Sequence, residues 1–372
     1  MDGSHILVVG GGIGGLTAAI ALRRKGFAVD LIERDPDWSV YGVGIIQQSN
    51  VVRAMAELDL LDEYIAAGQG FDTVEIYIPT GQRVAVVPSP KLVEGRPANM
   101  GIGRRALQKV LADRVCGSGT DIRLGVTVTQ LDDDGAGVDV AFSDGSTKRY
   151  DAVIAADGIY SETRKVLFPE APAPEFTGQS VWRYNLPRPA DQDGLWVFNG
   201  PNGIGLVPMS PKLMYMFVTT PEPENPWYPA DKLAKTMREK LAAVPAPQIR
   251  ALAEQITDDA GVVYRPLETF FLEGPWHRGR IALFGDAVHA TTPHLGQGAG
   301  MAIEDAIVIA DELSKALDPT AAFAAYRERR FERCRYIVDA SRAICDGQIG
   351  KGPPVDNHAA TKSMFEVVAQ PI

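Results

Sequence analysis

Three motifs in the chain combine residue types that bind dinucleotides. The first is Gly10-Gly11-Gly12-Ile13-Gly14-Gly15, followed at the end of the next apolar run by Glu33. Glycines at these spacings allow a tight turn and a close approach of backbone to a pyrophosphate, and the helix that follows directs free N–H groups at it. A Gly-rich turn that only packs a helix on a strand would leave Glu33 unexplained. An acid there accepts ribose hydroxyls and disfavours a 2′-phosphate, so this site predicts FAD or NAD(H), not NADP(H).

The second motif joins an acid to a glycine series in the last third of the chain. Asp286 follows the apolar run 281–284, and the glycine series comes soon after it. A flavin needs both features, because its ribityl hydroxyls need an acceptor and its N1–C2=O edge becomes negative on reduction, where helix N–H groups can stabilise it. For Asp286 alone, a helix cap is the alternative. Together with Asp286, the series predicts FAD contacts at Gly296, Gly298, Ala299, Gly300 and Met301.

The third motif is Asp157-Gly158, after another apolar run and followed by Ser161 and Arg164. Ser161 suits a helix N-cap, and Arg164 suits an ion-pair partner. Taken alone, this motif predicts a strand, a turn and a helix.

Strands and helices must bring these motifs together. Short apolar runs predict strands buried on both faces, at 5–9, 28–32, 150–156 and 281–284. The first two enclose a helical stretch that ends at Gly26, which makes a βαβ unit. Turn signals predict hairpins within 121–156, and the aromatic-rich segment 176–220 predicts an antiparallel sheet. Further helices are predicted at 103–117, in two short pieces within 231–256, at 298–317 and at 320–345.

The nucleotide-binding segments are scattered, with the aromatic sheet between them. This order predicts an α/β fold in which a Rossmann-like FAD-binding domain is discontinuous and carries an inserted, mostly antiparallel substrate domain, with helices at the C-terminal end. The predicted FAD-binding domain comprises 1–72, 98–175 and 276–345. The predicted substrate domain comprises 73–97 and 176–275, and 346–372 is expected to be a tail.

Composition excludes several other classes. The 372 residues carry 37 Lys+Arg against 47 Asp+Glu, a net charge of −10, which makes nucleic acid an improbable partner. No apolar run approaches the ~20 residues that a membrane span needs. Three cysteines and five histidines show no disulfide framework and no metal-ligand spacing, so we expect reduced thiols, a cytoplasmic location and no metal.

The order and spacing of the three motifs resemble those of the class A flavoprotein monooxygenases, the para-hydroxybenzoate hydroxylase family, over the chain to about residue 345. The resemblance implies that Glu33, with Arg34 beside it, binds the adenosine ribose, and that Asp286 binds the ribityl chain. Other positions match the family at the phosphates, the adenine and the flavin ring: Arg104 and Asp157-Gly158, Val128, and Gly44, Gln47 and Pro293. Ser49 stands where the family usually has a proline before Asn50.

Four further residues are candidates for contact with a substrate. Gln297 and His294 lie on the predicted loop over the flavin. Arg183 could bind a substrate carboxylate or phenolate, or be an exposed strand charge. Tyr215 lies on an alternating strand of which only one face can line a pocket, and the rest of that strand is core.

The resemblance implies a monooxygenase that consumes NADH or NADPH and O₂ and hydroxylates a small phenolic or other electron-rich aromatic or heteroaromatic substrate, through a flavin C4a-hydroperoxide. The expected assembly is a monomer or homodimer. Two alternatives stay open at this point. Trp182-Arg-Tyr-Asn-Leu-Pro187 is a degenerate form of the flavin-dependent halogenase signature, and a non-catalytic flavin-binding redox sensor would carry the same cofactor motifs.

Overall fold

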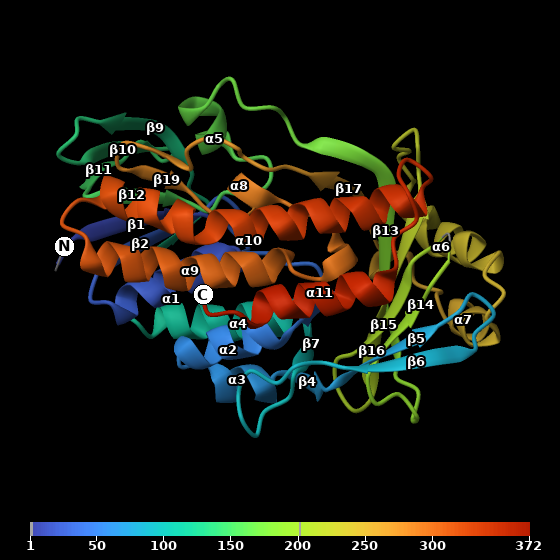
Figure 1. Cartoon of the computed structure of the whole chain (residues 1–372). Coiled ribbons are helices and arrows are strands. Elements are labelled where there is room, and N and C mark those ends of the chain that lie inside the picture. Colours follow the sequence, from blue (N-terminus) through green and yellow to red (C-terminus); the bar gives the residue numbers. More distant parts are fainter. Residues whose placement is uncertain (1–2, 201) are drawn as a thin grey trace.

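The computed structural model describes residues 3–200 and 202–372 and contains two large β-sheets (Figure 1). In this view one sheet lies near the N-terminus and the other at the far end, and the long helices α9 (Gly298–Lys315) and α10 (Pro319–Gln348) extend along the axis that joins them. The predicted α/β fold class, with a Rossmann-like part and a mostly antiparallel second sheet, is confirmed.

The first sheet has six strands in the order β18-β19-β12-β1-β2-β8. All neighbours are parallel except β18 and β19. Val8, in the central strand, pairs with Leu31 on one side and Ile154 on the other, and all three are fully buried. Because both faces of the central part of the sheet are covered, β1, β2, β12 and β19 are mostly apolar, whereas the edge strands β8 and β18 are more polar. The bounds are β1 (His5–Val9), β2 (Ala28–Glu33), β8 (Asp121–Leu124), β12 (Ala152–Ala155), β18 (His277–Arg278) and β19 (Ile281–Leu283).

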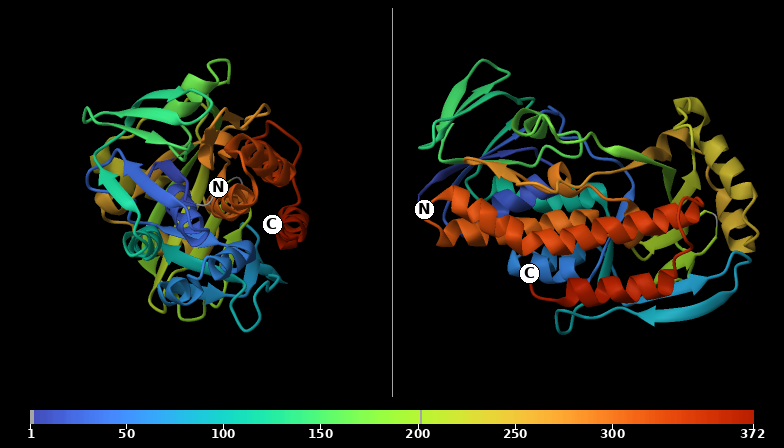
Figure 2. Two further views of the ribbon diagram at one scale, coloured as in Figure 1. Left: turned by 90° about the vertical axis from the view of Figure 1, so that its left-hand side faces the viewer. Right: turned by 45° about the horizontal axis from the view of Figure 1, so that its top comes forward.

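Different layers cover the two faces of this sheet (Figures 1 and 2). On one face α9 packs against α1 (Ile13–Arg24), which also packs against α4 (Arg104–Cys116). On the other face lies an antiparallel sheet of three strands, β9 (Val128–Asp133), β10 (Val138–Phe142) and β11 (Thr147–Tyr150). The shorter helices nearby are α2 (Ser49–Glu57), α3 (Leu61–Ala66), α5 (Glu162–Leu167) and α8 (Asp286–His289), with the 3₁₀ turn η3 (Pro293–Leu295).

The second sheet has seven strands in the order β17-β13-β16-β15-β14-β5-β6, antiparallel except for the pair β14 and β5. Its longest pairing aligns Arg183 of β13 with Phe217 of β16. The bounds are β5 (Thr73–Tyr77), β6 (Arg83–Pro88), β13 (Glu175–Pro187), β14 (Leu195–Phe198), β15 (Ile204–Pro208), β16 (Leu213–Pro221) and β17 (Val263–Thr269).

The two faces of the seven-stranded sheet pack against different elements. Its outer face forms an apolar cluster with α6 (Leu233–Ala242) and α7 (Pro247–Ala253), beside the turns η1 (Ala230–Lys232) and η2 (Asp259–Gly261). Its inner face meets a small antiparallel sheet of β3 (Gly44–Gln47), β7 (Asn99–Gly103) and β4 (Gly68–Phe71). The approach is so close that a Cβ on Gly101 would lie 1.9 Å from the carbonyl oxygen of Pro208.

The segment expected only as a tail contains a further helix, α11 (Asn357–Ala369). Asp356 caps it by accepting hydrogen bonds from the backbone of His358 and Ala359. Met364, Phe365 and Val368 are buried, and α11 packs against α2 and α10. The division of the chain into an FAD-binding and a substrate domain stays a prediction.

Within the part of the chain that the structure describes, no helix combines the length and the apolar character that a membrane crossing requires.

Candidate active site

The glycine motif forms a tight turn between β1 and α1. A Cβ on Gly15 would lie 1.8 Å from the carbonyl oxygen of Gly10, and one on Gly10 would lie 2.4 Å from that of Ala156. Gly12, the N-cap of α1, has nothing within 4 Å of its would-be Cβ and offers no capping side chain. The space beside Gly12 is therefore open and no side chain caps α1, as a pyrophosphate bound at this helix start requires.

Glu33 ends β2 beside this turn. Its carboxylate accepts hydrogen bonds from the backbone N–H of Gly11 at 2.7 Å and of Asp35 at 2.9 Å. Its carbonyl accepts a hydrogen bond from the N–H of Val126 at 3.0 Å, which brings the segment before Val128 alongside. Glu33 is thus fixed next to the glycine turn and keeps lone pairs for a ribose. The neighbouring Arg34 is exposed.

The Asp157-Gly158 turn follows β12 on the other side of β1. One oxygen of Asp157 accepts a hydrogen bond from the N–H of Thr163 at 3.0 Å, while the other is buried without a partner among the described groups. Such an orphaned acceptor next to the glycine turn fits a cofactor bound there. Ser161 caps α5, and buried Arg164 donates to the carbonyls of Ile159 and Ala287, so both have structural roles.

Asp286 and Arg104 are surrounded by protein, yet the side chain of each remains at least partly accessible to solvent. Asp286 begins α8 with an exposed side chain, and Arg104 begins α4 and is half-buried. The protein around them raises the pKa of Asp286 and lowers that of Arg104, and the attraction between the two charges offsets part of each shift. Neither side chain has a hydrogen-bond partner among the described residues. Both are therefore free for a ligand.

The glycine series after Asp286 brings the start of α9 to the same place. Gly296 adopts a left-handed conformation with φ of 67°, and the N-terminus of α9 lacks a side-chain cap. A Cβ on Gly14 of α1 would lie 3.4 Å from that of Ala302, so the starts of α1 and α9 are neighbours. The open glycine turn, the orphaned Asp157 oxygen and the unpaired Asp286 together fit FAD.

The structure brings Arg183 and Tyr215 together with Arg104. Arg183 is half-buried, and burial and the adjacent charge of Arg104 lower its pKa to about 10. Burial raises the pKa of Tyr215, which the nearby arginines partly oppose. Tyr215 also lies over Gly44, whose Cβ would come within 2.1 Å of the tyrosine ring. Arg183 and Tyr215 thus lie on the face of the seven-stranded sheet that meets β3 and the start of α4.

The other two substrate candidates are engaged by protein groups. Burial lowers the pKa of His294 to about 4, so its ring is neutral near pH 7. Its two nitrogens hydrogen-bond to Thr292 at 2.9 Å and to Gln348, at the end of α10, at 3.1 Å. Gln297 is 1% exposed, and its amide is bound by Asn50 and Gln48. The substrate roles of these two residues stay predictions that the geometry does not favour.

Sequence reasoning missed a link between the loop before β3 and the seven-stranded sheet. The hydroxyl of Tyr41, in the loop before β3, accepts hydrogen bonds from the Arg265 guanidinium on β17 at 3.0 and 2.6 Å. Asn185 of β13 donates to the carbonyl of Gly42 at 2.8 Å. The loop is thus tied to the seven-stranded sheet. No local pattern marks partners so far apart in the chain.

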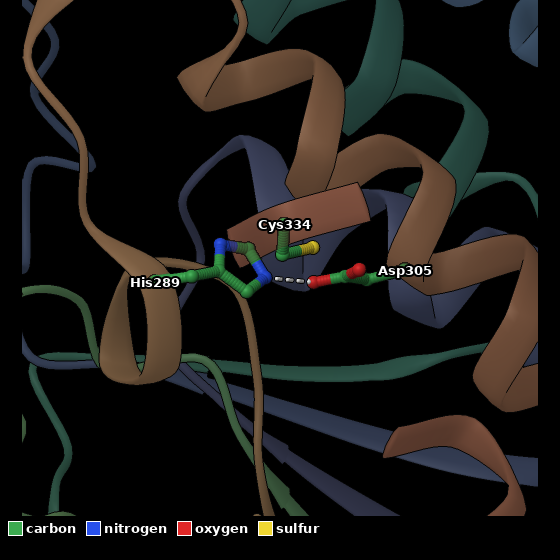
Figure 3. A group of neighbouring side chains, drawn as sticks. All are labelled: His289, Asp305 and Cys334. Carbon is green, nitrogen blue, oxygen red and sulfur yellow. Dashed lines mark hydrogen bonds and ion pairs between the residues drawn. The ribbon is translucent and has the colours of Figure 1, made fainter. Parts of the chain in front are cut away.

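A buried group next to Asp286 has atoms that metals bind. Ligand atoms of His289, Asp305 and Cys334 lie within 4.8 Å of one another (Figure 3). Asp305 is already bound to His289 at 2.6 Å and to the Arg330 guanidinium at 2.7 Å. A fixed positive charge at that distance disfavours a divalent cation, so the group is better described as an ion-pair cluster.

Asp286→Ala is expected to weaken FAD binding by about 10- to 100-fold while the fold survives, because ribityl hydroxyls would lose a charged acceptor and no protein bond would break. Titration of the apoprotein with FAD, followed by flavin fluorescence, measures this. Asp286→Asn keeps one carbonyl acceptor and should give an intermediate loss. Unchanged FAD affinity in the alanine variant would show that Asp286 does not bind FAD and only begins α8.

Comparisons with known proteins agree with this geometry. The family model described as "FAD binding domain" matches residues 4–341. The aurachin C monooxygenase/isomerase of Stigmatella aurantiaca is 33% identical to this chain, and the match covers 94% of this chain and 90% of that protein. An FAD-dependent urate hydroxylase of Klebsiella pneumoniae is 31% identical, and the match covers 93% of this chain and 90% of that protein. The crystal structure of Klebsiella pneumoniae HpxO with FAD and uric acid superposes with a TM-score of 0.83 at 28% identity, covering 98% of this chain and 92% of that one. The chain belongs to the FAD-binding-domain family, among the class A flavoprotein monooxygenases that use FAD and NAD(P)H.

Proposed function

We propose that this monooxygenase hydroxylates an aromatic or heteroaromatic substrate that carries an acidic group, and that Arg183 binds that group. The observation behind the proposal is that two cations, Arg183 and Arg104, lie near one site, and that neither side chain makes a salt bridge or hydrogen bond within the described residues. Arg183 shares a face of the sheet with Tyr215, which packs on Gly44. Gly44 pairs with Gly103, the residue before Arg104. Pyrophosphate oxygens are the expected partners of Arg104. A substrate carboxylate, phenolate or enolate would then neutralise Arg183, with two parallel hydrogen bonds that fix the ring plane.

The surroundings of Arg183 suit oxygen transfer. Bound FAD, once reduced by NAD(P)H, supplies the electrons that activate O₂ for insertion of one oxygen atom into the substrate ring. The chain's own task is to orient the ring and to exclude water. Tyr215 and Met209 serve the second purpose, because both pack against the backbone of Gly44 and close the space between β3 and β16.

The two alternatives are weaker. In the halogenase-like segment, Trp182 is fully buried on the outer face of the sheet, where its ring packs at a tilt against Tyr264 and Tyr228, with centroids 4.5 and 5.1 Å away. Because side chains alternate along a strand, Trp182 and Arg183 face opposite sides of the sheet, and the tryptophan cannot lie on the face that meets the flavin segments. A redox sensor would need no substrate anchor.

A screen of phenolic acids, quinolones and acidic N-heteroaromatics tests the proposal. We expect a binding compound to accelerate anaerobic reduction of the flavin by NAD(P)H in stopped-flow measurements, and to gain one ¹⁸O atom when ¹⁸O₂ is supplied. Neutral analogues that lack the acidic group should bind more weakly. Steady oxidation of NAD(P)H with no oxygenated product from any compound would favour the redox sensor. Tighter binding of the neutral analogues would contradict the proposal that Arg183 binds an acidic group of the substrate.

We also propose that the protein works in the cytoplasm as a monomer or homodimer. Cys116, Cys334 and Cys345 form no disulfide within the described residues, which supports the compartment. Sedimentation velocity of the FAD-loaded protein measures the assembly, and a tetramer would contradict it.

A further inference from the structure

A pair of buried amides joins the two segments that flank the predicted flavin ring. Gln297, at the start of α9, donates to the Asn50 side-chain oxygen at 3.1 Å and accepts from its nitrogen at 2.9 Å. Gln297 also donates to Gln48, so the β3–α2 segment and the loop 293–300 are locked together. All these side-chain contacts lie out of solvent. An amide pair in this setting is held strongly, since an unmatched group would be costly.

The amide pair is anchored to a buried carboxylate. Glu304, on α9, accepts a hydrogen bond from the Asn50 nitrogen at 3.2 Å and is 0% exposed. Three guanidinium groups surround the same carboxylate: Arg330 at 2.7 Å, Arg333 at 3.1 Å and Arg53 at 3.5 Å. A buried carboxylate needs such compensation. The cations fix the position of Glu304, and Glu304 in turn fixes Asn50.

Two of these arginines also bind the end of α11. Arg333 donates to the carbonyls of Gln370 and Pro371 at 2.9 and 2.7 Å. Arg53 donates to those of Val368 and Ala369 at 3.2 and 3.1 Å. These carbonyls lie at the end of the helix, where intrahelical donors are lacking and cationic side chains are favourable. A continuous set of contacts thus runs from α11 through Glu304 to Gln297.

We infer that Glu304 and Arg333 are positioning residues that couple the seating of α11 to the Gln297–Asn50 amide pair, and so to the loop 293–300 at the flavin. Met364 of α11 adds a direct contact, with its sulfur 3.6 Å from the Gln297 nitrogen. Asp305, the next residue on α9, holds His289 and thereby the Asp286 turn (Figure 3). Two consecutive acids of α9 therefore fix the two loops that carry the predicted flavin contacts.

Arg333 and Arg329 offer a matched pair for a test. Both lie on α10, and both donate to carbonyls beyond α11, Arg329 to Ile372 at 2.9 Å. Arg329 otherwise binds Asp311 and Glu312, so of these two arginines only Arg333 contacts Glu304. Arg333→Gln should disturb the flavin loop, and Arg329→Gln should loosen the same end of the chain without doing so. Neither variant leaves Glu304 unpaired, whereas Glu304→Gln could fail to fold.

The first readouts need no substrate and therefore depend only on FAD binding. We expect Arg333→Gln, and not Arg329→Gln, to change the visible spectrum and reduction potential of bound FAD, and to speed hydrogen exchange over 293–300 by about three- to tenfold. Arg333→Lys, which keeps one charged donor, should restore part of the wild-type values. The inference would be overturned if Arg333→Gln and Arg329→Gln gave the same spectrum, reduction potential and hydrogen-exchange rates, whether or not these differ from the wild type.

A further readout rests on the proposed function. With an accelerating substrate in hand, Arg333→Gln should release a larger share of its reducing equivalents as hydrogen peroxide, by about three- to tenfold. If the wild-type protein oxygenates nothing, the proposed function fails while the spectral comparison still tests the network. If product forms and the peroxide share matches that of Arg329→Gln, the network is contradicted and the function stands.

Discussion

Arg183→Met is expected to bind FAD as the wild type does and to bind an acidic aromatic substrate about 10- to 100-fold more weakly. The change removes a charge-assisted contact from a site where the ligand anion would have no other free cation, which costs about 1.5–3 kcal/mol. At a fixed substrate concentration, the acceleration of flavin reduction by substrate should decrease along with the substrate affinity. Equilibrium titration of the oxidised, FAD-loaded protein with substrate gives the first quantity, and anaerobic stopped-flow gives the second.

Two further variants distinguish a specific contact of Arg183 with the substrate from the overall positive charge near the site. Arg265→Met removes a positive charge from the next strand, but this arginine is exposed and engaged with Tyr41, so substrate affinity should change less than threefold, which is within about 0.7 kcal/mol. Arg183→Lys keeps the charge and loses the planar fork, and should recover part of the affinity. Equal losses in the Arg183 and Arg265 methionine variants would indicate long-range attraction in place of a specific contact.

The fold was predictable wherever local sequence and tertiary environment agree. Four strands of the six-stranded sheet, β1, β2, β12 and β19, are largely buried on both faces, so each is mostly apolar in sequence and easily recognised. The two edge strands, β8 and β18, are more polar and carry no such signal. The small sheet of β3, β7 and β4 was not found, because strands such as Asn99–Gly103 and Gly68–Phe71 are short, rich in glycine and without alternation. The helix α11 was missed because its buried face rests on only three apolar side chains, although Asp356 was available as a cap signal.

The residues of the candidate active site also differ in how far they could be predicted from the sequence. Motifs that are contiguous in sequence, such as Gly10–Gly15 and the series after Asp286, identify the cofactor because a turn and the helix after it are local structures. Contacts between side chains far apart in the chain carry no such signal. Tyr41 and Arg265 are 224 residues apart, and Gln297 meets Asn50 across 247. Gln297 therefore looked like a substrate contact, whereas its amide is occupied in the interior.

Gly12→Ala is expected to fold normally and to bind FAD about 5- to 150-fold more weakly. In this structure the added methyl group would meet no atom within 4 Å, so the apoprotein has no clash to relieve. The same space lies in front of the α1 N-terminus, where the pyrophosphate must approach the backbone. Overpacking such a contact costs about 1–3 kcal/mol. FAD titration of the apoprotein measures the loss, and thermal unfolding of the apoprotein shows whether the fold is intact.

Two other glycines make this result interpretable. Gly15→Ala would place a Cβ 1.8 Å from the backbone oxygen of Gly10, which cannot move away, so we expect loss of the folded protein as well as of FAD. Gly274→Ala, like Gly12→Ala, adds a methyl group with nothing within 4 Å, but in a loop outside the cofactor motifs, and should keep both fold and FAD affinity. If Gly12→Ala binds FAD as tightly as Gly274→Ala, the phosphates do not approach the start of α1. The pyrophosphate would then have to bind at another site. If Gly12→Ala unfolds, the glycine is required by the turn itself, and its role toward FAD loses its support.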